Sequence, residues 1–247
     1  MRIGKSTNPV LSEKRFKKIQ TETVSSTELM TINGTLNKTI LLFTLLLISG
    51  FFAWKAVATG AASHSLLIFG LVGGLVLAFA TIFKPHWSQY TAPAYAIFEG
   101  ILVGAVSALY EMMYDGIVLK AIGLTLSVLF IMLVLYRSGT LKATPKFKKG
   151  VIIAGGGVFF FYLLNITASM FGGGLSLGNF GLIGILIQLV IVGVASMFLI
   201  LDFDSIENGV KNGLPKYMEW YSGFGIMLTL VWLYFEILRL LSFISGD

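Results

Sequence analysis

The chain has 247 residues, of which 56% are hydrophobic and only 12% are charged, and its mean hydropathy is +0.86. Soluble domains carry about 25% charged residues, so the composition excludes an ordinary soluble domain and indicates a polytopic membrane protein. The absence of cysteine excludes disulfides and thiolate metal sites. The net charge of +6 comes from a few basic clusters, which we expect to set membrane orientation rather than to bind nucleic acid.

Residues 1–36 are polar and rich in lysine and arginine. They lack the apolar core and the small-residue cleavage site of a signal peptide. We therefore expect a solvated, cytoplasmic basic tail over 1–36 and one transmembrane domain over 37–247. The S-E-K-R-F-K-K-I run within the tail also fits a short helix lying on anionic lipid.

The rest of the chain divides into apolar runs close to the ~20 residues that a helix needs to cross a bilayer. We expect an all-α fold with seven transmembrane helices. The predicted spans are 39–59, 65–83, 92–113, 117–136, 150–171, 181–204 and 223–244.

Basic residues alternate between the two sides of these spans. They gather in the tail and in the loops after the second, fourth and sixth spans, which contain Lys84, Arg137, Lys142 and Lys211. The other loops are poor in bases. By the positive-inside rule, the N-terminus is cytoplasmic and the C-terminus lies outside.

Glycines recur within the spans. Gly100 and Gly104 in the third span have the small-xxx-small spacing that allows two transmembrane helices to approach closely. We expect these glycines to serve packing, because the chain contains no phosphate-binding G-x-x-x-x-G-K-[ST] motif.

Carboxylates interrupt the apolar spans in the third, sixth and seventh runs. Glu99 lies in the third, Asp202 and Asp204 end the sixth, and Glu236 lies inside the seventh. An acid in hydrocarbon must be protonated, paired or hydrated, so each is a candidate functional residue. Asp202 and Asp204 face different sides of a helix, and we expect Asp204 to point inward because it shares a face with Asn208.

The seventh span offers two further candidates. Thr229 lies at a depth similar to that of Glu99, and Glu236 follows seven residues later on the same face. Arg239 lies three residues beyond Glu236, so a same-helix ion pair near the outer interface is the alternative to a functional Glu236.

Burial gives such carboxylates a definite chemistry. The charged form is disfavoured away from water, so a buried acid can respond to pH. When deprotonated, it offers the oxygen ligands that Ca²⁺ prefers. Asp204 and Glu99 do not make a full cage, so we expect at most a weak, partly hydrated Ca²⁺ site and no resident metal or cofactor.

Three stretches resemble the Bax inhibitor-1 (transmembrane Bax inhibitor motif) family. A-P-A-Y-A-I-F-E-G-I-L-V-G is similar to its third helix, L-D-F-D-S-I-E to the end of its sixth, and L-Y-F-E-I-L-R-L-L to its last. The long basic tail most resembles the bacterial YccA-like branch, which implies a bacterial plasma (inner) membrane location. The resemblance also implies six helices packed around a central C-terminal helix.

The same resemblance implies a pH-sensitive calcium leak controlled by two aspartates, one on each of the last two helices. Asp204 matches the first aspartate best, with Asp202 as the alternative. Alignment on Arg239 puts Thr229 at the second position, whereas alignment on L-Y-F-E puts Glu236 there. We prefer the first alignment, which leaves no second aspartate and makes Glu99 the candidate second acid.

The sequence therefore supports two functions. The first is a pH-responsive cation leak that carries Ca²⁺, with Asp204 and Glu99 as the proton and ion sites. The second is a non-conducting regulator that binds other membrane proteins in stress response or quality control, supported by the charged tail and by the basic loop between the fourth and fifth spans. We expect no enzyme, because no Ser–His or His-rich metal pattern occurs.

Overall fold

A computed structural model describes residues 29–61, 64–174 and 177–246. The predicted tail lies mostly outside the described residues, since only its last eight residues, 29–36, fall within them. The fold consists of long helices with short connections, and its elements are α2 (Ile32–Ala58), α3 (His64–Phe83), η1 (Pro85–Trp87), α4 (Ser88–Met113), α5 (Ile117–Arg137), α6 (Pro145–Met170), η2 (Leu177–Phe180), α7 (Leu182–Lys211) and α8 (Met218–Ser245).

Seven of these helices are long and apolar enough to cross a membrane. The predicted all-α class with seven spans is therefore confirmed. The helices extend beyond the apolar runs, chiefly toward the polar end at which α2 begins. There α2 starts at Ile32 and α6 at Pro145, so the first turns of both lie outside the predicted spans.

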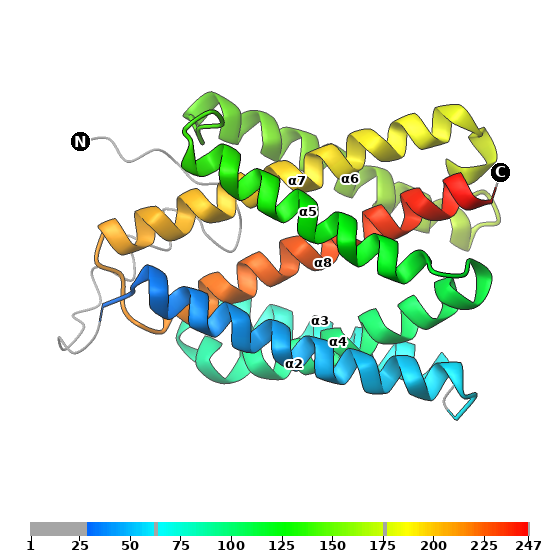
Figure 1. Ribbon diagram of the computed structural model, residues 1–247, viewed down its shortest axis with the longest axis horizontal. Coiled ribbons are helices and arrows are strands. Elements are labelled where there is room, and N and C mark those ends of the chain that lie inside the picture. Colours follow the sequence, from blue (N-terminus) through cyan, green and yellow to red (C-terminus); the bar gives the residue numbers. More distant parts are fainter. Residues whose placement is uncertain (1–28, 62–63, 175–176, 247) are drawn as a thin grey trace.

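Helix α8 lies between two groups of three helices (Figure 1). Helices α2, α3 and α4 pack together on one side, and α5, α6 and α7 lie on the other. Direct packing on α8 comes mainly from α2, α4, α5 and α7, whereas α3 packs on α4 and α6 packs on α7. The C-terminal helix is thus the central one, as the family resemblance implied.

The buried core follows from this position of α8. Its large, almost completely buried side chains include Tyr221, Phe224, Met227 and Leu233. Exposed hydrophobic side chains instead cover the outer faces of peripheral helices such as α3 and α6. In a bilayer those faces contact acyl chains, so the apolar exterior and the packed interior are both stable.

Helices α2 and α4 approach each other closely through glycine. A Cβ on Gly104 would overlap the backbone carbonyl of Gly50, and one on Gly100 would overlap the backbone at Leu46. The Gly100/Gly104 spacing therefore serves helix packing, as predicted.

The two ends of the bundle differ in charge. We call the end at which α2 begins and α7 ends the basic end, since Lys38, Lys148 and Lys211 lie there. The other end, which contains the α2–α3, α4–α5 and α6–α7 connections and the C-terminus of α8, is called the distal end.

Candidate functional site

One face of α7 is buried along most of the helix, and this face shows which aspartate points inward. Buried positions follow one another every three or four residues along the helix, at Gln188, Ile191, Ala195, Leu199, Asp202, Ile206 and Gly209. This is the spacing of one helix face, and α7 packs extensively on α8. Asp202 belongs to this face and is 0% exposed.

Asp204 lies two residues further on and points away from that face, with its side chain 20% exposed. The expectation that Asp204 is the inward aspartate and Asp202 the hydrated one is therefore wrong. The physical reason is that the buried periodicity of the whole helix, rather than the Asp204/Asn208 pair, sets the face that packs on α8.

Asp204 forms an ion pair with Lys148, which links α7 to α6. Lys148 lies in the first turn of α6, where Thr144 caps the helix and Pro145 begins it. The Asn208 Nδ2 atom donates to Asp204 Oδ2 over 2.8 Å, which confirms the predicted shared face. The Lys148 side chain is only 10% exposed, so the pair is largely shielded from solvent.

A second carboxylate stands beside this pair. Glu207 accepts a hydrogen bond from the Tyr136 hydroxyl of α5 over 2.5 Å and pairs with Lys211 on its own helix. Asp204 and Glu207 together connect α7 to both α6 and α5 at the basic end.

Glu99 has different neighbours. It is 9% exposed and lies beside Tyr95, one turn earlier on α4. A Cβ built on Gly74 of α3 would lie 3.2 Å from Glu99 Oε2, so the carboxylate points toward α3. The Tyr95 ring meets Phe224 of α8 edge-on at 4.9 Å, which connects this acid to the central helix.

The structure does not join the predicted site residues into one group. Glu99 contacts Tyr95 and faces α3, whereas Asp204 contacts Lys148 and Asn208. Thr229 is buried on α8 at 7% exposure. The acids of the third and sixth spans therefore occupy separate places in this structure.

Glu236 lies at the centre of a polar cluster inside the distal half of the bundle. It is 2% exposed and accepts hydrogen bonds from Tyr162 over 2.7 Å, Gln188 over 2.7 Å and Trp232 over 2.8 Å. Arg239 pairs with the same carboxylate at 3.2 Å. The predicted ion pair between Glu236 and Arg239 is confirmed, and Tyr162 and Gln188 add contacts from α6 and α7.

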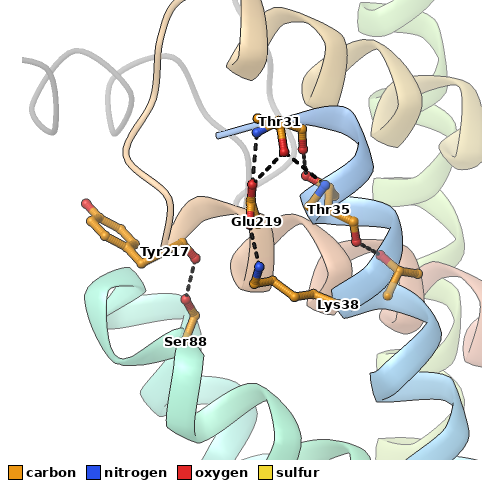
Figure 2. A network of polar contacts seen from close by, with 8 residues as sticks. Thr31, Thr35, Lys38, Ser88, Tyr217 and Glu219 are labelled. Carbon is orange, nitrogen blue, oxygen red and sulfur yellow. Dashed lines mark hydrogen bonds and ion pairs between the residues drawn. The ribbon is translucent and has the colours of Figure 1, made fainter. Parts of the chain in front are cut away.

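Glu219 was not among the residues singled out from the sequence. It is 1% exposed in the first turn of α8 and accepts from the backbone N–H of Thr31 over 2.9 Å and from its hydroxyl over 3.0 Å. Lys38 of α2 contacts its other oxygen at 2.5 Å (Figure 2). The sequence shows that Glu219 precedes an apolar run. Which lysine pairs with it depends on how α2 and α8 are aligned along their axes, and the sequence does not show this.

The segment before α2 strengthens this contact between α2 and α8. The Met30 backbone N–H donates to Leu214 O over 2.7 Å, and Leu29 forms an isolated antiparallel β-bridge with Pro215. Ser88 of α4 donates to Tyr217 O over 2.9 Å in the same region (Figure 2). We call the Lys38–Glu219 and Lys148–Asp204 pairs the two clasps of the basic end.

These residues offer hydrogen-bonding and proton chemistry. Within the described parts of the chain, no group of three or more histidine, aspartate or glutamate side chains could hold a metal ion. A cation here would therefore meet single carboxylates and water rather than a cage.

Comparison with protein families gives one match. The profile described as Bax inhibitor 1 like matches residues 8–246, which is nearly the whole chain. The match specifies no branch of the family. Neither the curated proteins nor the solved structures include a match to the chain.

Proposed function

Because the chain belongs to the Bax inhibitor 1 like family, we propose that it is a pH-responsive leak for a hard cation such as Ca²⁺. We also propose that it belongs to the YccA-like branch of the family. It would then lie in a bacterial plasma membrane, with its basic end in the cytoplasm. The positive-inside rule supports this orientation, because Lys84, Arg137, Lys142 and Lys211 all belong to that end.

The observation that carries the proposal is the pair of clasps. Each consists of a lysine and a carboxylate on different helices, and the side chains are at most 20% exposed. A carboxylate that takes up a proton loses its charge and with it most of its attraction to the lysine. Neutralisation of Asp204 would therefore loosen α6 from α7, while the Lys38–Glu219 clasp keeps α2 on α8.

Asp202 gives the opened bundle a place for the ion. It lies two residues before Asp204 on the face of α7 that packs on α8. Water that enters when the Lys148–Asp204 clasp loosens would reach this carboxylate, and Asp202 would then supply an oxygen ligand to a partly hydrated cation.

Glu99 acts in the proposal as a separate proton site. Its position beside Tyr95, and the contact of Tyr95 with Phe224, connect its protonation to the position of α8. Thr229 and Glu236 have lesser roles: Thr229 is a buried neutral residue of α8, and the Glu236 charge is matched by Arg239.

The test is calcium flux into proteoliposomes as a function of internal and external pH. The Asp204→Asn variant places a neutral group where protonated aspartate would be, so it should raise flux at neutral pH and flatten its pH dependence. Glu99→Gln should also shift the pH profile. The control is Asp115→Asn, an exposed residue of the α4–α5 connection, which should behave as the wild type.

If Asp204→Asn and Glu99→Gln both fold and leave flux and its pH dependence unchanged, the leak mechanism fails. If neither the wild type nor any variant raises calcium flux above background, the result would instead support the second function, a non-conducting regulator that binds other membrane proteins.

A further inference from the structure

A cleft of about 360 Å³ lies over α8 in the distal half of the bundle. Helix α4 contributes Leu102, Val106 and Tyr110 to its lining, and Tyr162 of α6 lies across from them. Helix α6 packs mainly on α7 rather than on α4. The cleft therefore lies between two helices that do not close over the central one.

The floor of the cleft on α8 carries two charged residues, Glu236 and Arg239. Arg239, whose side chain is 35% exposed, lines the cleft together with Trp232 and Phe235. Helix α8 is long and apolar enough to cross a membrane, so in a bilayer we expect this side chain to lie at or within the lipid. A charged side chain that is accessible from lipid needs an explanation beyond the packing of the bundle.

The hydrogen bonds of the cluster leave Arg239, not Glu236, able to bind a ligand. Glu236 already accepts from Tyr162, Gln188, Trp232 and Arg239. Arg239 donates to Tyr162 over 2.5 Å and to Glu236 over 3.2 Å, and both hydrogen bonds come from its Nη1 atom. The guanidinium has further donors on its other two nitrogens, in the fork geometry that binds phosphate in a bidentate manner.

The depth of these residues fits an amphiphile. With 1.5 Å per residue, Arg239 lies about 9 Å from the Ser245 end of α8, near the boundary between acyl chains and headgroups. On α4, which runs in the same direction, Tyr110 is at about the same level, and Val106 and then Leu102 lie progressively deeper. The cleft is thus polar toward the interface and apolar toward the membrane centre.

We propose that this cleft binds a phospholipid of the leaflet at the distal end, with its phosphate on Arg239 and an acyl chain along Leu102 and Val106. A phosphate diester matches the free guanidinium donors, and a chain matches the apolar depth. A cation does not fit, because the oxygens of the Glu236 carboxylate already accept hydrogen bonds from the side chains around them. This inference is independent of ion conduction.

Native mass spectrometry of the protein extracted from vesicles tests the proposal. The vesicles contain equal amounts of phosphatidylglycerol and a glucosyl diacylglycerol with the same chains, which lacks phosphate. The wild type should retain phosphatidylglycerol in preference to the glycolipid. The charge-neutral double variant Glu236→Gln/Arg239→Gln should retain it roughly tenfold less, which corresponds to about 1.4 kcal/mol.

Two further variants separate lipid binding from misfolding. Val106→Trp fills the apolar part of the cleft without touching the polar cluster, and it should also lower retention. Lys120→Gln removes an exposed base at the same end of the bundle and should retain lipid as the wild type does. Equal retention of the two lipids by the wild type, or unchanged retention in folded Glu236→Gln/Arg239→Gln and Val106→Trp, would overturn the proposal.

Inorganic phosphate distinguishes a lipid headgroup from a small anion. In lipid-free detergent, added phosphatidylglycerol should raise the melting temperature of the wild type but not of the double variant, whereas inorganic phosphate should raise neither. Stabilisation of the wild type by inorganic phosphate alone would make the site an anion site and contradict the lipid assignment.

Discussion

Lys38 of α2 and Glu219 of α8 are 181 residues apart in the chain, yet their charged atoms are 2.5 Å apart. Glu219 is 1% exposed and also accepts both the N–H and the hydroxyl of Thr31. Thr31 caps α2 through Gly34 N. One carboxylate therefore fixes the start of the first membrane helix on the start of the central helix.

This arrangement predicts strong coupling between the two residues. Lys38→Gln and Glu219→Gln should each lower the free energy of unfolding by about 3 kcal/mol, because each leaves the other charge without its partner in a shielded place. The double variant should cost clearly less than the sum of the singles. Thermal unfolding in detergent measures the cycle.

Lys211→Gln is the matched control for this cycle. Lys211 pairs with Glu207 on the same helix, but its side chain is 65% exposed. Its removal should cost only about 0.3–0.5 kcal/mol. Additive effects of Lys38→Gln and Glu219→Gln would show that the clasp does not hold α2 on α8.

Two glycines should respond in opposite ways to substitution by alanine, because only one of them lies in the α2–α4 contact. Gly104→Ala should destabilise the protein by about 2 kcal/mol, because the new methyl group would meet the Gly50 backbone, which cannot rotate away. Gly156→Ala in α6 meets nothing within 4 Å and should stabilise by up to about 1 kcal/mol through helix propensity. Melting temperatures of the two variants check the difference, and a stable Gly104→Ala protein would contradict the close approach.

The hydroxyl of Tyr162 bridges Glu236 and Arg239 across helices. Tyr162→Phe keeps the ring over the guanidinium and removes only this bridge, so it should cost about 1–2 kcal/mol. Tyr90→Phe provides the control, since Tyr90 is 73% exposed. Equal melting temperatures for both variants would show that the hydroxyl contributes no stability.

Much of the fold could be read from the sequence, because length and apolarity alone determine which segments span a membrane. The face of α7 could also have been read. The spacing of Ala195, Leu199, Asp202 and Ile206 is that of one helix side, and it outweighs the Asp204/Asn208 pair that suggested the wrong face. The Glu236–Arg239 pair was predictable because it lies within one helix.

Contacts between helices could not be predicted in the same way. The partners Lys148 of Asp204 and Lys38 of Glu219 come from other helices, and their meeting depends on axial register that no local pattern records. Depth along a helix is readable at 1.5 Å per residue, but rotation toward a given neighbour is not. Depth alone therefore could not show whether Glu99 and Asp204 meet, and in the structure they have different neighbours.

The central claim is that the ion pair of Lys148 and Asp204 keeps a cation leak closed at neutral pH. Calcium flux at neutral pH through charge-reversal variants tests it most directly. Lys148→Asp and Asp204→Lys should each leak, and the double variant K148D/D204K should restore closure because it restores the attraction. If both single variants fold and stay closed, or if the folded double variant leaks as much as either single variant, the account is contradicted.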